Sequence, residues 1–384
     1  MLELLFLLLP AAVAYGWVMG KHSAKKELLT QQLSLNKALN SSVSLLLNNE
    51  EEQAFDRLIQ YFDDSPSNIE NYLTLAKLFR KKCEIDKAIA IHEGLVKTDQ
   101  IEISQFDLEV IQLELAQDFL SAGMLERALD NLTSLMKSDH ANDALIMKLH
   151  IFEQTREWQR GLDAYLETKP SDLNQSSREL VSHFYCEVAD ASDNLKSKKQ
   201  SYKRALKVNS NCIRALVSLA KLYLLLNNKQ QSRELIIQIL DQEPAFAPAL
   251  FNIAPECFID EFEQAAWLYW LIKEKNIKSV TAHNQMAEYI VKEKGVEAGR
   301  QYIIEHLQNV PSVRGFAKLI ELEKEFFMSD PHYDQLQTLI TRYIELKPNY
   351  ECKTCGFTSN YFSWRCPACN NWQTIKPLAG LDGI

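Results

Sequence analysis

Glycine and proline are scarce in this sequence, with only 11 of each among 384 residues. Neither G-x-x-x-x-G-K-[ST] nor G-x-G-x-x-G occurs, so the common backbone loops that hold phosphate groups are absent from the sequence. The metalloprotease motif H-E-x-x-H and the nucleophile turn G-x-S-x-G are absent as well. Because few residues break helices while Leu, Ala, Glu and Lys are abundant, the composition predicts a mainly α-helical protein.

An excess of positive charge is also lacking. The chain has 42 Lys and Arg against 51 Asp and Glu, which gives a formal net charge of −9. Proteins that bind nucleic acids usually present a basic surface, so the charge balance argues against that class. Hydrophobic residues make up 46% of the chain, which is enough for a folded core, and the length predicts two or three domains.

Residues 1–20, MLELLFLLLPAAVAYGWVMG, form an apolar segment whose charged side chain is Glu3. A helix of this length spans roughly 30 Å, the thickness of the hydrocarbon core of a membrane. Lys21, Lys25 and Lys26 follow directly, and basic residues favour the cytoplasmic side. The sequence therefore predicts a single transmembrane anchor, followed by a juxtamembrane linker at 21–34 and a cytoplasmic remainder.

The alternative for this segment is a secretory signal peptide, because Ala12-Val13-Ala14 resembles a cleavage site. A signal peptide carries its basic residues before the apolar run, whereas here they come after it. Cleavage would make the rest of the chain an extracytoplasmic assembly scaffold. The uncleaved anchor is the interpretation that we favour.

Small residues recur twelve positions apart along the middle of the chain, and an aromatic residue often follows the first of them by three positions. Two antiparallel helices approach closely only where small side chains meet. The pattern resembles the tetratricopeptide repeat, a helix–turn–helix unit of 34 residues. The small-residue pairs are Ala76 with Ala88, Ala116 with Ala128, Ala254 with Ala266 and, approximately, Ala287 with Ala298.

The repeats are expected to form an α-solenoid over 35–313, followed by a helical cap or degenerate repeat over 314–348. Pro255 falls inside the first helix of its unit and predicts a kink. An irregular helical solenoid without true repeats is the alternative. The predicted units begin near Leu35, Ile69, Glu109, Asn142, Glu179, Ile213, Ala247 and Val280.

The first helices of such repeats line a concave groove, which could hold a peptide or a loop of a partner. The alternative for each polar side chain on these helices is ordinary solvated surface. The candidate partner-binding residues are Lys77, Arg80, Gln117, His150, Glu153, His183, Glu187, Lys221 and Glu288.

Two C-x-x-C pairs lie near the C-terminus, in YECKTCGFTSNYFSWRCPACNNWQTIKP. Cys352 and Cys355 are separated by ten residues from Cys366 and Cys369, so two facing turns can bind one metal ion through four thiolates. Zinc is favoured over iron, and four protein ligands leave no open position, which predicts a structural site. A small metal-binding module is therefore expected over 349–384, and its sequence resembles a rubredoxin-like zinc ribbon. The alternatives are two disulfides or the redox-active iron site of an electron carrier.

The aromatic residues of this module are expected to pack against the last helices rather than to stack on nucleic-acid bases. The remaining cysteines show no metal-ligand spacing, and we expect them to be buried free thiols within helices. They are Cys83, Cys186, Cys212 and Cys257.

These three parts, in this order, resemble the lipopolysaccharide assembly protein B family of Gram-negative bacteria over nearly the whole chain. The resemblance is carried by the anchor MLELLFLLLPAAVAYGWVMGKHSAKK, the repeats LFRKKCEIDKAIAIHEGLV (78–96) and ELAQDFLSAGMLERA (114–128), and the ending YECKTCGF…WRCPACNNWQTIKP. Cys83 stands where the family usually has glycine. The metal ligands of the family carry over to Cys352, Cys355, Cys366 and Cys369.

The resemblance implies a non-enzymatic protein of the bacterial inner membrane that faces the cytoplasm and regulates lipopolysaccharide synthesis. It implies an adaptor that presents the deacetylase of the committed step of lipid A synthesis to the membrane-bound AAA protease of the FtsH type. A second inner-membrane protein is expected to antagonise it. No nucleic-acid partner is expected, and formation of a homo-oligomer is left open by the sequence.

Overall fold

The computed structural model describes residues 69–97, 103–168, 173–251, 253–324 and 331–383, together with a few short stretches before residue 58. Most of the predicted anchor and the first predicted repeat, which begins near Leu35, lie outside these residues. Within the described part of the chain, no helix is both long and apolar enough to cross a membrane. The chain divides into two compact units, residues 1–151 and 152–384.

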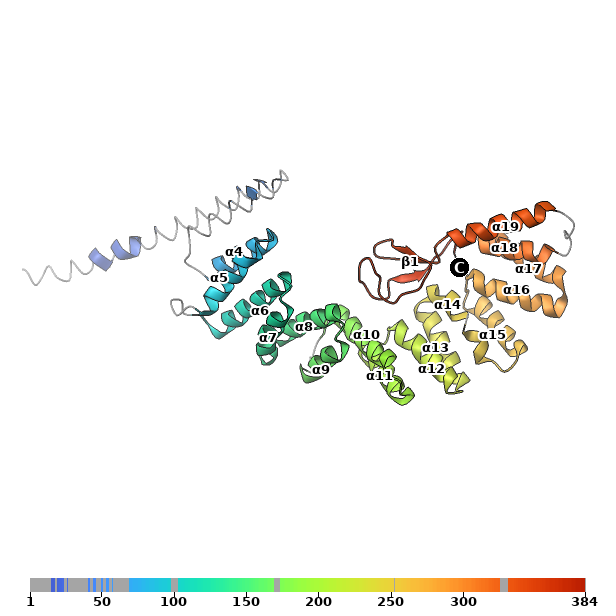
Figure 1. Ribbon diagram of the computed structural model, residues 1–384, viewed down its shortest axis with the longest axis horizontal. Coiled ribbons are helices and arrows are strands. Elements are labelled where there is room, and N and C mark those ends of the chain that lie inside the picture. Colours follow the sequence, from blue (N-terminus) through green and yellow to red (C-terminus); the bar gives the residue numbers. More distant parts are fainter. Residues whose placement is uncertain are drawn as a thin grey trace, which may run out of the picture. The chain divides into compact units, whose positions relative to one another are not determined.

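Successive antiparallel helices build both units (Figure 1). The first unit contains α4 (Ile69–Lys81), α5 (Ile85–Lys97), α6 (Gln105–Ser121), α7 (Leu125–Ser134) and η1 (Leu135–Lys137), and the unit boundary falls within α8 (Ala141–Thr155). The second unit continues with α9 (Trp158–Thr168), α10 (Gln175–Ala191), α11 (Leu195–Val208), α12 (Ile213–Leu225), α13 (Lys229–Gln242), η2 (Pro244–Phe246), α14 (Ala247–Phe251), η3 (Ala254–Cys257), α15 (Glu261–Glu274), α16 (Val280–Lys294), α17 (Val296–Asn309), α18 (Val313–Glu323) and α19 (Pro331–Leu346).

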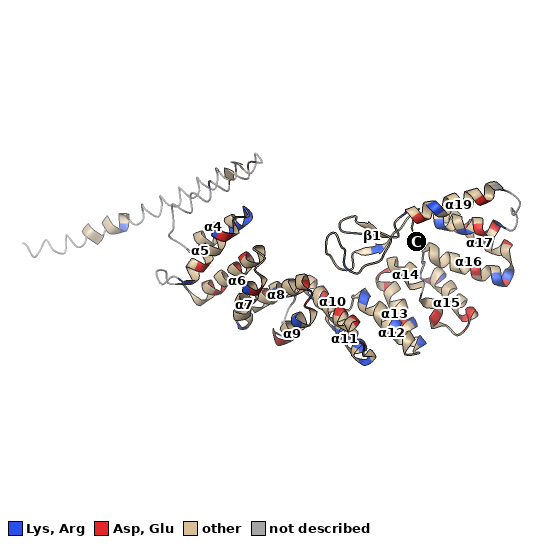
Figure 2. Ribbon diagram, in the orientation of Figure 1, with Lys and Arg blue, Asp and Glu red and all other residues tan. Residues whose placement is uncertain are grey.

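These helices form hairpins, so the predicted mainly helical solenoid is confirmed. Basic and acidic residues are interspersed along most of the helices (Figure 2). Helix α11 is an exception, because it contains six Lys and Arg but no acidic residue. The helices that begin at Ile69, Ile213 and Val280 start at the predicted positions.

The periodic aromatic residues lie next to the hairpin turns. In four hairpins the turn contains a residue in the left-handed conformation, and the next backbone N–H donates to the carbonyl of an aromatic residue five positions earlier. This bond ends the first helix of the unit in a Schellman-type turn. The left-handed residues and their aromatic acceptors are Cys83 with Phe79, Gly123 with Phe119, Arg156 with Phe152 and Asn227 with Tyr223.

Cys83 therefore corrects the expectation of a buried thiol within a helix, because it is exposed and lies in the turn between α4 and α5 with φ 61°. The turn needs a residue in the left-handed conformation, which glycine adopts more readily than cysteine. Cys186, Cys212 and Cys257 are buried as predicted.

Small residues lie at the helix crossings in the first unit, where Ala76, Ala88, Ala116 and Ala128 are all fully buried. Two later pairs were misassigned. Ala266 is exposed, and the adjacent Ala265 is the buried small residue of α15. Ala287 faces Gly299 rather than Ala298, since a Cβ built on Gly299 would lie 3.2 Å from the carbonyl oxygen of Ala287.

The predicted kink at Pro255 is a full interruption. The segment that would form one helix is divided into α14 and η3, because proline lacks the N–H that continues a helix. The fragments are held by a hydrophobic core of the second unit, which includes the fully buried Phe246 and Phe251.

The C-terminal module is a small three-stranded antiparallel sheet in the order β2-β1-β3. The strands are β1 (Tyr350–Cys352), β2 (Thr358–Ser359) and β3 (Ile375–Pro377). Tyr350 pairs with Ser359, and Cys352 pairs with Ile375. Cys352, Cys366 and Ile375 form its small buried cluster, so the core of the module consists largely of its metal-binding cysteines.

Candidate metal centre and its docking surface

The four sulfur atoms of the C-x-x-C pairs converge on one point. All four Sγ atoms lie within 4.8 Å of one another, and the Cys352–Cys369 and Cys355–Cys366 distances are both 3.7 Å. A metal–sulfur distance of about 2.3 Å places tetrahedral sulfur atoms about 3.8 Å apart, so the four thiols fit a single tetrahedral ion. A disulfide needs about 2.05 Å, and all four cysteines are free.

Two matching turns bring these sulfur atoms together. Gly356 follows the first pair with φ 74°, and Asn370 follows the second with φ 60°. Their N–H groups donate to the carbonyls of Cys352 and Cys366 respectively, each over 2.9 Å. Each turn therefore needs a residue that tolerates the left-handed conformation directly after its second cysteine, as the sequence predicted.

The centre is closed and partly buried. Cys352 and Cys366 are almost fully buried, Cys369 is intermediate and Cys355 is exposed. The Cys352 sulfur also lies 3.3 Å from the Thr374 hydroxyl, which can donate to a thiolate. Four thiolates would complete a tetrahedral ion without a water position, so the arrangement suits a structural metal rather than a catalytic one.

Trp372 fixes the module to the solenoid. Its indole N–H donates to the Glu153 carboxylate over 2.8 Å, and its ring stacks on His183 with centroids 4.4 Å apart. Trp158 contacts the same ring edge-on at 6.3 Å. Burial, together with the Arg214 cation, lowers the pKa of His183 to about 3, so a neutral imidazole stacks on the indole at pH 7.

A second group of contacts lies beside the first. The Gln373 side-chain oxygen accepts hydrogen bonds from the backbone N–H groups of Ile213, at 2.6 Å, and Arg214, at 3.4 Å, where α12 begins. The Trp364 ring stacks on Phe246 of η2, with Phe362 edge-on to the same ring. A salt bridge joins Lys376 to Glu243. The ring contacts thus lie on α9, α10 and η2, which corrects the expectation that the aromatic residues pack against the last helices.

The residues that flank the module do reach those last helices. The Val313 N–H donates to the Leu381 carbonyl over 2.9 Å, and the Arg314 guanidinium donates to the Asn349 side chain over 2.5 Å. Asp382 forms a salt bridge of 3.0 Å with Lys347. The module is therefore held at both of its ends as well as across its face.

The structure brings several of the predicted groove residues together. In the first unit, Glu114 joins Lys77, at 2.9 Å, and Arg80, at 2.7 Å, and Arg80 also reaches the fully buried Asp118. In the second unit, Glu153 and His183 contact Trp372, so the metal module of the same chain covers these two candidate residues. Glu187 pairs with Arg214, Glu288 pairs with Lys318, and Gln117, His150 and Lys221 are exposed.

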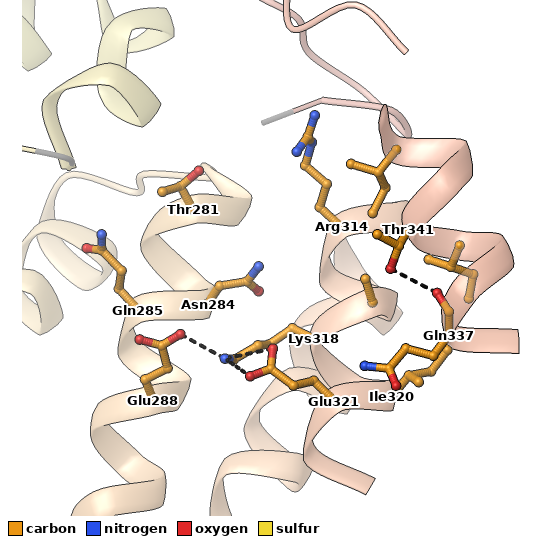
Figure 3. A pocket seen from close by; sticks show the side chains of 13 residues that line it. Thr281, Asn284, Gln285, Glu288, Arg314, Lys318, Ile320, Glu321, Gln337 and Thr341 are labelled. Atoms are coloured by element: carbon orange, nitrogen blue, oxygen red, sulfur yellow. Dashed lines mark hydrogen bonds and ion pairs between the residues drawn. The ribbon is translucent and has the colours of Figure 1, made fainter. Parts of the chain in front are cut away.

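A groove of about 460 Å³, lined by both polar and apolar residues, lies between α16, α18 and α19 (Figure 3). Lys318 is nearly buried in it, held 2.7 Å from Glu288 and 3.1 Å from Glu321. Buried atoms of Asn284 and Arg314 have no hydrogen-bond partner among the described residues. The predicted residue Glu288 thus lines a groove, but its charge is already balanced by Lys318.

Sequence reasoning missed Gln373, Arg214 and Glu243 as docking residues. Arg214 is nearly buried and pairs with Glu187 and Asp190, both over less than 2.8 Å. No spacing signal distinguishes these side chains from surface residues, because their partners lie about 24 to 160 positions away in the sequence. The aromatic cluster around the cysteines was the one visible sign of a docked face.

Residues 350–377 match the rubredoxin metal binding domain family. Over the full length of both chains, the sequence is 31% identical to lipopolysaccharide assembly protein B of Escherichia coli and 28% identical to the protein of the same name from Haemophilus influenzae.

Among solved structures, a tetratricopeptide repeat protein from Parabacteroides merdae aligns with 80% of this chain and 99% of its own, at 9% identity and a TM-score of 0.34. The full-length identity to the Escherichia coli protein is the finding that assigns the family. The chain belongs to the lipopolysaccharide assembly protein B family.

Proposed function

We propose that this protein is a non-enzymatic regulatory adaptor of lipopolysaccharide synthesis at the bacterial inner membrane, with the bulk of the chain in the cytoplasm. In this role it presents the deacetylase of the committed step of lipid A synthesis to an FtsH-type AAA protease, and an inner-membrane antagonist opposes it. The observation that carries the proposal is the full-length identity to proteins named for lipopolysaccharide assembly.

The physical features of the chain support an adaptor. Helical solenoids offer extended surfaces for other proteins, and the sequence contains no nucleophile–base motif. An adaptor must contact two partners at once, and a membrane tether would raise its effective concentration near a membrane protease. The first twenty residues have the composition for such a tether.

The metal centre has a structural part in this proposal. Zinc is the ion that we propose for Cys352, Cys355, Cys366 and Cys369, because it prefers a closed tetrahedral thiolate site and has no redox chemistry. When bound, the ion holds together a module whose own apolar core is small. The module then presents Trp372 and Gln373 in the positions that the solenoid recognises.

The half-life of the deacetylase tests the proposal. We expect depletion of this protein to lengthen the half-life after synthesis is stopped, measured by immunoblot. Wild-type protein should restore rapid loss, whereas a variant without residues 1–20, produced at the same level, should not. An unchanged half-life after depletion would refute the adaptor role.

Electron transfer is the second candidate, because four thiolates at these distances can also hold iron. The colour and the metal content of the protein distinguish the two functions. Protein purified from its native host should be colourless and contain one zinc per chain, whereas a ferric four-thiolate site is strongly coloured. A coloured, reducible protein would favour the electron carrier over the adaptor.

Membrane topology separates the adaptor from an extracytoplasmic scaffold. A protease added to intact spheroplasts should leave the repeats uncut, with lysed spheroplasts as the control. Digestion in the intact preparation would place the repeats outside the cytoplasm and exclude a cytoplasmic adaptor.

A further inference from the structure

Two cysteines outside the metal centre face each other in the core of the second unit. Cys186 lies on α10, and Cys212 is the N-cap residue of α12. Their sulfur atoms are 4.0 Å apart, and both side chains are fully buried. Cys257 differs, because its sulfur contacts the Ser232 hydroxyl at 3.5 Å and the Ile253 carbonyl at 4.0 Å. The chain thus offers a paired thiol site and a matched unpaired thiol.

The surroundings make the two sulfur atoms chemically unequal. The neighbouring Cys186 thiol, with further contributions from Ser182, the Ala215 backbone and the Arg214 cation, lowers the pKa of Cys212 to about 7, although burial opposes this shift. Burial instead raises the pKa of Cys186. A thiolate at a helix N-terminus beside a protonated thiol is the arrangement in which one sulfur attacks an oxidant and the other resolves the product.

The pair lies directly at the docking surface of the metal module. Cys212 immediately precedes Ile213 and Arg214, whose backbone N–H groups hold the Gln373 side chain. Cys186 lies one helical turn after His183, which stacks on Trp372. A disulfide requires the sulfur atoms to approach by about 2 Å, to about 2.05 Å. That movement would displace the start of α12 relative to α10, and both helices contact the module.

We propose that Cys186 and Cys212 form a redox-active dithiol that a peroxide converts to a disulfide, and that the disulfide weakens the docking of the metal module. The proposal concerns the chain alone and does not rest on the adaptor role. It adds an oxidation-sensitive site that is separate from the four metal-binding cysteines.

The reaction proceeds in two steps. The Cys212 thiolate attacks one oxygen of hydrogen peroxide, the O–O bond breaks, hydroxide leaves, and a sulfenic acid forms. The Cys186 sulfur then attacks the Cys212 sulfur, the S–O bond breaks, and the departing hydroxide takes the Cys186 proton as water. Two thiols and one peroxide give one disulfide and two waters, with two electrons passing from sulfur to oxygen. A small thiol reverses the reaction by exchange.

Peptide mapping of the full-length, metal-loaded protein in detergent tests the chemistry. After treatment with hydrogen peroxide and blocking of free thiols, we expect a linked peptide pair containing Cys186 and Cys212, which is released by dithiothreitol. Cys257 should stay open to alkylation after denaturation. A Cys257→Ser variant should still form the link, whereas Cys212→Ala and Cys186→Ala variants should not.

Hydrogen exchange tests the effect on docking. The backbone amides of Ile213 and Arg214 should exchange about tenfold faster in the disulfide form, as expected for the loss of one or two hydrogen bonds. Reduction should restore the slow rate. The proposal is overturned if wild-type protein forms no Cys186–Cys212 link while its fold and metal content are intact. A link that leaves the exchange of these amides unchanged would also overturn it.

Discussion

Removal of the Trp372 ring should release the metal module from the solenoid while leaving the metal in place. Trp372 makes the hydrogen bond to Glu153 and the stacking contact with His183, but it is not a metal ligand. The Trp372→Ala variant therefore separates docking from metal binding.

The expected loss of docking free energy follows from these two contacts. A hydrogen bond to a charged group contributes about 1.5–3 kcal/mol, and an aromatic pair contributes about 0.5–1.5 kcal/mol beyond the buried area. Together they amount to about 3 kcal/mol, or a roughly hundredfold shift of the docking equilibrium. Glu153 keeps a second partner in Arg365 at 3.3 Å, which limits the cost of its lost hydrogen bond.

Hydrogen exchange followed by mass spectrometry measures this shift at Ile213 and Arg214, together with zinc content by metal analysis. We expect much faster exchange at these amides and unchanged metal stoichiometry. Tyr361→Ala is the matched control, because Tyr361 is an aromatic residue of the same module that is 84% exposed. Exchange rates in Trp372→Ala that stay within about twofold of the control, against the hundredfold expected, would show that Trp372 does not anchor the module.

Three further predictions concern the metal, the repeat packing and pH. Cys366→Ser should lower the metal content and make the module sensitive to protease, and unchanged metal stoichiometry would argue against the four-thiolate site. Gly161→Ala should destabilise the second unit by about 1–3 kcal/mol in thermal unfolding, because the new Cβ would lie 2.3 Å from a ring carbon of Phe184. Gly94→Ala has open space and should be neutral or stabilising. Burial and the neighbouring His306 lower the pKa of His283 to about 4, below its unfolded value of about 6.5, so its contribution to stability should fall as pH decreases from 6.5 to 4. Urea unfolding at several pH values should show a weaker pH dependence in His283→Asn.

The spacing of small and aromatic residues in the sequence predicted the repeats well where the helices are continuous. The aromatic residue three positions after a buried alanine, as in Ala76 with Phe79, lies where the first helix ends and its carbonyl closes the turn. The same spacing did not predict the helix boundaries near Pro255. There the fragments α14 and η3 are held by a shared core rather than by continuous helical hydrogen bonds.

The groove was the least predictable part of the site. Helix position marked Glu153 and His183 as candidate groove residues. It did not show that Trp372, about 200 positions away, covers them. Helix position likewise marked Lys77 and Arg80 as candidates, but it did not show the buried Asp118 and the bridging Glu114 that hold them.

The sequence by itself determined the helical repeats and the four-thiolate centre, because both depend on residues close together in the chain. A twelve-residue spacing sets a helix crossing, and two residues between cysteines set the turn that directs their thiolates to one ion. Only the tertiary structure decided where the module docks and that Cys186 meets Cys212. Those contacts join residues that are far apart in the sequence, and their positions depend on how successive helices pack rather than on any local pattern.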